Sequence, residues 1–209
     1  MNKAAMAVVA IVAITAGVWF GSQQNKVDLS NLSGFSFPQP ALLKDIDLIN
    51  YDSERLTEEY FKDQWTFVYV GYTKCPDACP ETLLTLNRIN TLINEDQVNE
   101  DQTQVNTLLV SVDPERDTPS HLKDYVKFFN EGFHAATGTP DKIKHFADQV
   151  SALYALPEDR SDANYLVDHS SSIVLINPDG AVQAIFTPPQ EVEALVNDFE
   201  LLNTHYQSS

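Results

Sequence analysis

Basic residues are scarce in this chain of 209 residues. It carries 13 lysine and arginine residues against 30 aspartate and glutamate residues, which gives a formal charge of -17. Proteins that bind nucleic acid gain much of their affinity by placing lysine and arginine against phosphates. The composition therefore excludes nucleic acid as a partner. It is compatible with a cationic protein partner, and equally with an acidic surface that only keeps the protein soluble.

Cysteine is scarcer still, because the chain has only Cys75 and Cys79, four positions apart. A disulfide across so short a loop adds little stability, since it removes little freedom from the unfolded chain. Three uses of the pair stay open: a structural disulfide, a cycle between dithiol and disulfide, and a site for a soft metal ion.

The two cysteines lie between a predicted strand and a predicted helix. Residues 65–70, Trp-Thr-Phe-Val-Tyr-Val, are β-branched and aromatic without polar alternation, which is typical of a strand buried on both faces. A proline follows each cysteine and disfavours helical backbone before it, so both cysteines are expected outside any regular helix. With Pro80 as the first helical residue, Cys79 would be the N-cap, where the helix dipole favours a thiolate. Lys74 would add a second positive charge that favours a thiolate, beside Cys75.

The rest of the chain is predicted to alternate strands and helices. A short edge strand is expected at 43–49, helices at 81–93, 121–129, 140–154 and 189–206, and further strands at 105–112, 133–137, 173–176 and 182–186. The first three crossovers favour parallel strands, and the last two strands form a hairpin around Asn177 to Gly180. The pattern predicts an α/β fold, a three-layer α/β/α sandwich with the dithiol loop after a central strand.

The N-terminal 25 residues are predicted to anchor the protein in a membrane. Residues 4–20 carry no charge and reach the short end of a membrane-spanning helix. A cleavable signal peptide is the competing interpretation, but no convincing cleavage site follows Phe20. The expected organisation is an anchor at 1–25, a linker at 26–41 and a domain at 42–209.

This organisation predicts a bacterial inner-membrane protein with a single N-terminal span and a periplasmic domain. The single lysine before the apolar run, Lys3, favours an inside N terminus. The periplasm is oxidising, so Cys75 and Cys79 would form a disulfide there unless they are kept reduced.

Three short strings resemble the motifs of one family. G-Y-T-K-C-P-D-A-C-P at 71–80 resembles the signature of the Sco/SenC family, the thioredoxin-like copper-handling proteins that serve cytochrome c oxidase assembly. S-V-D-P-E-R-D-T-P at 111–119 and D-H-S at 168–170 are similar to two further motifs of that family. In the first of these strings Asp117 or Thr118 can cap the next helix, with Pro119 in its first turn. Arg116, which lies among acidic residues, is expected to stitch this loop rather than to bind substrate. Many members carry histidine where this chain has Lys74, a position that is not a family metal ligand. The resemblance covers the chain from about residue 45 and implies a thioredoxin-like fold.

The resemblance implies a copper site made by Cys75, Cys79 and His169. Two thiolates and one imidazole suit Cu(I), and also Cu(II) with a strong thiolate bond. Three protein ligands leave copper under-coordinated, whereas a structural zinc site normally has four. Asp77 and Asp168 are candidates to orient the loop or His169, or are simply a cap and a solvated charge. The remaining histidines are expected to be structural or exposed: His121, His134, His145 and His205.

Two functions fit these residues. The first is a membrane-tethered copper chaperone that passes copper to the binuclear copper centre of cytochrome c oxidase subunit II, a target that the resemblance implies. The second is a thiol–disulfide oxidoreductase that reduces the cysteines of that centre, with Cys75 and Cys79 as the catalytic pair. Another copper donor or a thioredoxin-like reductant would then be a further partner. His169 separates the two functions, because a dithiol reductase does not need it. Beyond the fold, nothing favours a peroxidase.

Overall fold

The structure is a computed structural model, and it describes residues 27–96 and 105–208. The predicted anchor at 1–25 lies outside these residues. Within them, no helix combines the length and the apolar character needed to cross a membrane. The chain divides into two compact units, Ser33–Val196 and a smaller unit of Met1–Leu32 with Asn197–Ser209. All of the sheet and the candidate site belong to the unit Ser33–Val196.

The larger unit is built on one mixed sheet. The elements are β1 (Phe35–Leu42), β2 (Leu48–Asn50), β3 (Arg55–Leu56), η1 (Glu58–Phe61), β4 (Trp65–Gly71), α2 (Ala78–Asp96), β5 (Val105–Ser111), α3 (Pro119–Phe129), β6 (His134–Thr137), α4 (Pro140–Gln149), β7 (Tyr154–Ala155), β8 (Asp168–His169), β9 (Ile173–Ile176), β10 (Ala181–Phe186) and α5 (Val192–Gln207). Among the described residues the main sheet has the strand order β1-β10-β9-β4-β5-β6-β2-β3, and β7 pairs only with β8.

Strand β4 lies in the middle of this sheet and leads into the dithiol loop. All seven of its residues are buried, as the aromatic and β-branched run predicts. It pairs in parallel with β5 on one side and antiparallel with β9 on the other. The predicted buried strand is therefore confirmed, and the dithiol loop begins where this strand ends.

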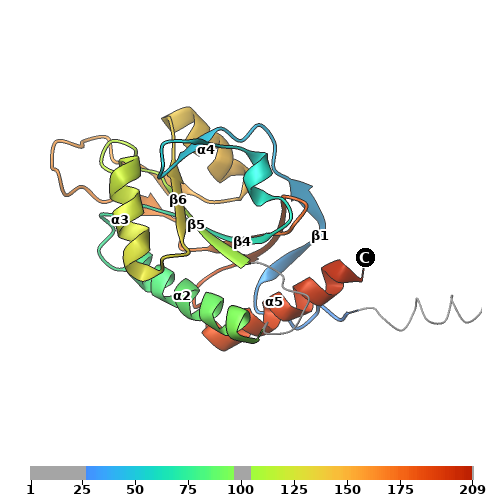
Figure 1. Cartoon of the computed structure of the whole chain (residues 1–209). Helices are drawn as coiled ribbons and strands as arrows, with labels where there is room; N and C mark the ends of the chain where they lie inside the picture. Colours follow the sequence, from blue (N-terminus) through green and yellow to red (C-terminus); the bar gives the residue numbers. More distant parts are fainter. Residues whose placement is uncertain (1–26, 97–104, 209) are drawn as a thin grey trace, which may run out of the picture. The chain divides into compact units, whose positions relative to one another are not determined.

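Helices cover both faces of the sheet, which confirms the expected three-layer α/β arrangement. α2 and α3 lie on one face and α4 on the opposite one (Figure 1). On the α4 face, Phe146 stacks on Phe61 of η1 with ring centroids 6.1 Å apart. The predicted start of α3 is also confirmed: the Thr118 side chain caps the helix by accepting the His121 N–H, and Pro119 occupies the first turn.

The third crossover differs from its prediction, because β9 runs antiparallel to β4. When a single helix connects two strands of a sheet, it brings the chain back to the end where the first strand started, so that the second strand is parallel to the first. Here the long segment after α4, residues 150–172, carries the chain back to the end of the sheet at which β4 finishes. Strand β9 therefore starts beside the dithiol loop, with Ile173 opposite Tyr69, and His169 arrives at the same edge.

The prediction that residues 26–41 form a linker with little regular structure is wrong for residues 35–41. Strand β1 (Phe35–Leu42) pairs antiparallel with β10. Its prolines, Pro38 and Pro40, are tolerated because β1 is an edge strand whose register shifts between Ser36 and Ala41. The expected edge strand at 43–49 is instead β2, at Leu48–Asn50, and it is paired on both sides.

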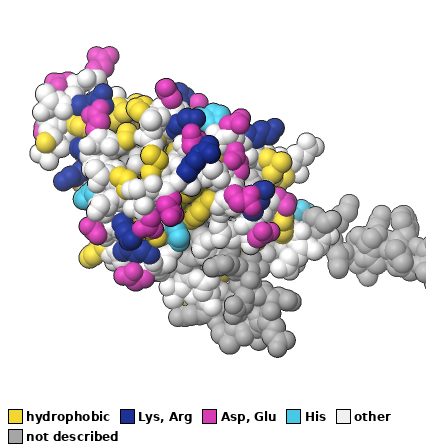
Figure 2. Space-filling model, turned by 45° about the horizontal axis from the view of Figure 1, so that its top comes forward, with side chains coloured by type: hydrophobic (Ala, Val, Ile, Leu, Met, Phe, Trp, Pro, Cys, Tyr) yellow, Lys and Arg dark blue, Asp and Glu magenta, His cyan; other side chains and the backbone are white. Residues whose placement is uncertain are grey.

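Charged side chains of both signs are mixed on the molecular surface. Figure 2 shows acidic and basic side chains interspersed over one face, with hydrophobic side chains in small separate patches. Such a surface suits solubility. The acidic excess of the sequence therefore does not collect into a single-sign field on this face.

Candidate metal centre

Three side chains named from the sequence meet at the end of the sheet. Cys75 comes from the loop after β4, Cys79 from the first turn of α2 and His169 from β8. Their ligand atoms all lie within 4.8 Å of one another. The Cys79 Sγ is 3.5 Å from the His169 Nε2, and both cysteines are free thiols. Tertiary structure thus brings two thiols together with an imidazole that lies 90 residues after the nearer cysteine.

Cys79 lies inside helix α2, so the prediction that it falls outside regular helix is wrong. The Glu81 N–H donates to the Asp77 carbonyl (3.2 Å) and closes the first turn across Cys79. The conformational bias that Pro80 places on the preceding residue is modest enough for this hydrogen bond to override it. The Cys79 N–H in turn donates to the Cys75 Sγ at 3.4 Å, which holds the two sulfur atoms on one side of the turn.

The Cys79 thiol is fully buried, and the lack of a side chain at Gly71 makes room for it. A Cβ at Gly71 would approach the Cys79 Sγ to 2.7 Å and the Tyr69 Cε1 to 3.0 Å. Burial raises the pKa of Cys79 to about 12, with a smaller opposing contribution from a backbone hydrogen bond to Tyr72. For Cys79, the prediction that the helix terminus and Lys74 would lower the thiol pKa is therefore wrong, because desolvation outweighs them.

His169 is oriented by a main-chain carbonyl. Its Nδ1 lies 3.1 Å from the Ser170 oxygen, which can only accept, so Nδ1 carries the proton. The Nε2 lone pair then faces the Cys79 thiol, which is protonated at neutral pH because its pKa is raised. A carbonyl, rather than Asp168 or Asp77, holds the imidazole; both aspartate side chains are exposed.

Two tyrosines that the sequence reasoning did not select enclose the imidazole. The Tyr69 and Tyr72 rings lie edge-on to His169, with centroids 6.0 and 5.6 Å away. The Tyr72 hydroxyl also accepts the Val167 N–H at 3.1 Å, so it holds the segment before β8. The sequence held one signal that could have identified these tyrosines. Tyr69 lies near the end of β4 and Tyr72 lies in the loop that leads from β4 to Cys75.

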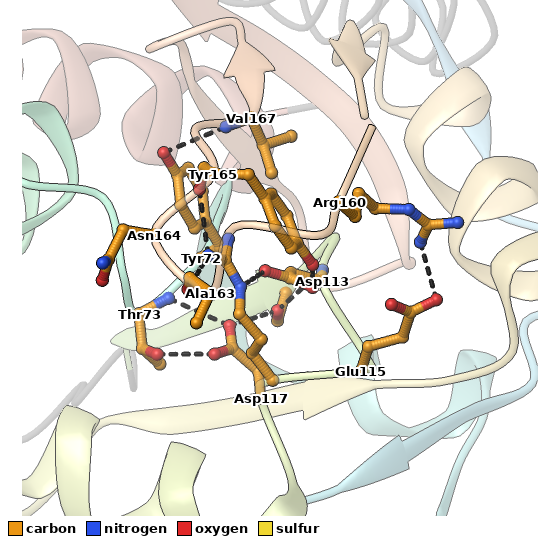
Figure 3. Close-up of polar contacts among 12 residues, drawn as sticks. Tyr72, Thr73, Asp113, Glu115, Asp117, Arg160, Ala163, Asn164, Tyr165 and Val167 are labelled. Atoms are coloured by element: carbon orange, nitrogen blue, oxygen red, sulfur yellow. Dashed lines mark hydrogen bonds and ion pairs between the residues drawn. The ribbon is translucent and has the colours of Figure 1, made fainter. Parts of the chain in front are cut away.

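A buried carboxylate pins the dithiol loop from the other side. Asp117 is fully buried and accepts hydrogen bonds from the Thr73 N–H (2.9 Å), the Thr73 hydroxyl and the Ser111 hydroxyl (2.6 Å). Figure 3 shows Thr73 and Asp117 facing each other. Because Thr73 is two residues before Cys75, this contact positions the loop that carries the thiol. The sequence predicted capping for this region and missed the contact with Thr73.

Arg116 joins the loop after β5 to the segment before His169. Its guanidinium donates to the carbonyls of Ala163 (3.1 Å) and Tyr165 (2.9 Å), pairs with Asp113 and lies 3.5 Å over the Tyr165 ring. The Tyr165 hydroxyl donates to Asp113 at 2.6 Å (Figure 3). The expectation that Arg116 stitches its own loop is confirmed by its ion pair with Asp113, and its hydrogen bonds also reach the segment before His169.

Three of the other four histidines contact residues other than the candidate ligands, and of these contacts only that of His121 reaches the dithiol loop. His121 contacts the Thr73 hydroxyl, His134 stacks on Tyr51, and His145 contacts the Lys44 carbonyl. Within the described residues, three side chains form the only cluster of histidine, cysteine, aspartate or glutamate that could hold a metal ion: Cys75, Cys79 and His169.

Comparisons with known proteins agree on one family. The family model described as SCO1/SenC matches residues 38–203. The chain is 33% identical over 173 residues to Protein SCO1 homolog 1, mitochondrial, of Arabidopsis thaliana, covering 83% of this chain and 50% of that protein. It is 32% identical over 159 residues to an SCO2-like protein of Rickettsia conorii, covering 74% and 75% respectively. These two matches thus span half and three quarters of the relatives' lengths.

A solved structure also resembles the fold described above. The Arabidopsis thaliana ScoI structure with copper bound superposes with a TM-score of 0.68 at 32% identity, covering 81% of this chain and 98% of that one. The thioredoxin-like α/β fold expected from the motifs is therefore shown.

Proposed function

The chain belongs to the SCO1/SenC family, and from that premise we propose that it binds copper and delivers it during assembly of cytochrome c oxidase. Copper is the cargo of this function, and Cys75, Cys79 and His169 hold it. The solved Arabidopsis relative contains bound copper, which supports the choice of metal.

One observation carries the proposal: two sulfur donors and one imidazole nitrogen lie within 4.8 Å of one another. Thiolate and imidazole together are the donors that copper prefers in either oxidation state. A structural zinc site would use a fourth protein ligand, and among the described residues no fourth such donor joins this group. Three ligands leave the ion open to an incoming ligand from an acceptor, as transfer requires.

The residues of the chain prepare the site before the metal arrives. His169 presents an unprotonated Nε2 towards the Cys79 sulfur, because Nδ1 is bonded to the Ser170 carbonyl. Cys79 holds its proton until the metal displaces it, so loading releases a proton and strengthens with rising pH. Cys75 is half-buried and is the more accessible of the two thiols, which makes it the natural point of exchange with an acceptor.

The location and the acceptor extend the proposal. Residues 1–25 would anchor the protein in the inner membrane of a bacterium and place the domain in the periplasm. The acceptor would be the binuclear copper centre of subunit II of cytochrome c oxidase, reached by ligand exchange between thiols.

The test is a Cu(I) titration of the reduced full-length chain against a competing chelator. We expect one ion per chain, with the affinity falling at least about tenfold in both His169→Ala and Cys75→Ser, since even residues that only orient ligands are worth that much. His145→Ala is the matched control and should bind as the wild type does. An affinity that is the same in wild type and His169→Ala would contradict the proposal.

One observation favours a second function, reduction of the acceptor's cysteines. Cys75 is partly accessible while Cys79 is buried behind it, the arrangement of an attacking and a resolving thiol. Cys75 would attack the acceptor disulfide, and Cys79 would then release the reduced acceptor and leave a Cys75–Cys79 disulfide. This reaction needs no His169, so a His169→Ala variant that still reduces the acceptor but no longer holds copper separates the two functions.

A further inference from the structure

A groove begins beside the metal centre and runs along helix α2. It has a volume of about 890 Å³, within the range of sites that hold ligands. Ala78 lines the groove and precedes Cys79, while Ser171 lines it two residues after His169. One end of the groove is therefore lined by sequence neighbours of two candidate ligands, Cys79 and His169.

One wall of the groove is a stripe along α2. Glu81, Thr85, Arg88 and Leu92 all line it, and their spacing of four, three and four residues places them on one side of the helix. The core side of α2 is made by other residues, including Leu83 and Leu86. The stripe is therefore not used for packing the domain.

The opposite wall is the segment between β10 and the first turn of α5. Gln190 fixes this wall, because its Nε2 donates to the Ser171 carbonyl (2.7 Å) and to the Phe186 carbonyl (3.2 Å). The first of these hydrogen bonds ties the wall to the segment that carries His169. Glu191 and Glu193 follow on the same wall and are exposed.

Charge selects the occupant of the groove. Its charged lining residues are three acids, Glu81, Glu191 and Glu193, and one base, Arg88. The acids lie on both walls of the groove, near the first turns of α2 and α5. Arg88 lies two helical turns beyond Glu81, or about 10 Å along the axis. An extended peptide covers that distance in about three residues.

We propose that this groove docks a basic, extended segment of the protein that receives copper from this chain. A lysine or arginine of that segment faces Glu81, Glu191 and Glu193, and an acidic residue about three positions away faces Arg88. The proposal rests on the copper-delivery function, because an acceptor must bring its own ligand to Cys75 or His169. A segment seated in the groove reaches Ala78 and Ser171, which neighbour Cys79 and His169 in the chain.

The experiment measures copper transfer from the copper-loaded, full-length chain to the soluble copper domain of subunit II from the same organism, kept reduced and metal-free. The double variant Glu81→Gln/Glu193→Gln removes two groove acids. The control Asp124→Asn/Asp141→Asn removes two exposed acids from α3 and α4. Asp141 matches Glu193 because each lies in the first turn of its helix.

We expect the groove double variant to transfer copper about tenfold more slowly than wild type in low salt, because charges at an interface act mainly on association. The difference should shrink in 1 M salt, where charges are screened beyond about 3 Å. The control variant should transfer at the wild-type rate. All forms should bind copper equally in the chelator titration.

A second pair of variants tests the groove by shape. Thr85→Trp fills the groove and should slow transfer at every salt concentration. Leu84→Trp adds the same ring at the neighbouring residue, which is 53% exposed and does not line the groove. It should leave transfer unchanged.

The outcomes distinguish the groove from the function. If both groove variants transfer copper normally, or if the controls slow transfer equally, the docking proposal is wrong and the copper-delivery proposal stands. A wild-type chain that holds copper but never transfers it overturns delivery to this acceptor, and the groove proposal falls with it.

Discussion

The dithiol segment and the segment around His169 contribute to one site, but they are held by contacts of different range. Cys75 and Cys79 are positioned mainly by their neighbours: a buried strand before them, a helical turn around Cys79 and the N–H to sulfur contact between them. Asp117 adds one contact from a distant loop, to Thr73. His169 lies in a strand of two residues. Its segment is held from distant parts of the chain, by Tyr72 and Arg116.

The difference shows that the dithiol half of the site is held mostly by local contacts, whereas the His169 half depends on the fold. Changes to the long-range network should therefore weaken the imidazole side and spare the dithiol. Changes within the dithiol segment should act on the sulfur atoms first.

The largest expected effect comes from removing the long-range network. Arg116→Ala removes hydrogen bonds to Ala163 and Tyr165 and leaves Asp113, whose side chain is 1% exposed, without its cation. Breaking a buried ion pair from one side costs about 3 kcal/mol. We expect a loss of that size in the free energy of unfolding, measured by denaturant titration, together with weaker copper binding.

Arg160→Ala is the control for this prediction. Arg160 pairs with Glu115 at 2.6 Å, but both side chains are exposed, so its loss should cost less than about 1 kcal/mol. The Cys75–Cys79 pair of Arg116→Ala should still oxidise to a disulfide. If Arg116→Ala and Arg160→Ala are equally stable and bind copper equally well, the long-range account of the His169 side is wrong.

A smaller effect is expected from crowding the local half. Gly71→Ala places a Cβ 2.7 Å from the Cys79 sulfur, so the thiol or the β4 backbone must shift. Overpacking of a buried site costs about 1–3 kcal/mol. We expect a loss in that range, with weaker copper binding in the chelator titration. Gly132→Ala is the control, since its Cβ meets only a side-chain oxygen of Asn130 at 3.2 Å.

The smallest effect concerns the pH dependence of the metal-free, reduced chain. Because burial raises the pKa of Cys79 to about 12, the folded chain keeps this proton at a pH where the unfolded chain has lost it. The stabilisation is complete below the unfolded thiol pKa and is lost as pH rises from there towards the folded value. We expect the Cys79 thiol to contribute about 1 kcal/mol per pH unit to the fall in the free energy of unfolding above pH 9.

The two cysteines provide the comparison for this measurement, which is a thermal or denaturant titration at pH 8 to 10.5 under reductant. Cys79→Ser should flatten the alkaline slope relative to wild type, and Cys75→Ser should keep it. Equal slopes in the two variants would show that Cys79 is not the group that titrates.

The features predicted best are those whose physics is local. The apolar run of β4, the Thr118 cap before Pro119 and the turn around Gly180, whose φ is 78°, each depend on a few adjacent residues. The candidate ligands Cys75, Cys79 and His169 were named through motif resemblance.

The features that were mispredicted depend on distant partners. Prolines in β1 are acceptable only because that strand lies at the edge of the sheet, and the direction of β9 depends on where residues 150–172 cross the molecule. The raised pKa of Cys79 follows from burial, which is a property of the packed site and not of its helix position.

The sequence by itself determined the local elements, the candidate ligands and the family to which the chain belongs, because strand pattern, helix caps and motif spacing are properties of neighbouring residues. Only the tertiary structure decided that His169 meets the two thiols, that Asp117 and Arg116 hold the loops of the site, and that Cys79 stays protonated. These depend on contacts between residues far apart in the chain and on the exclusion of water, which no short stretch of sequence encodes.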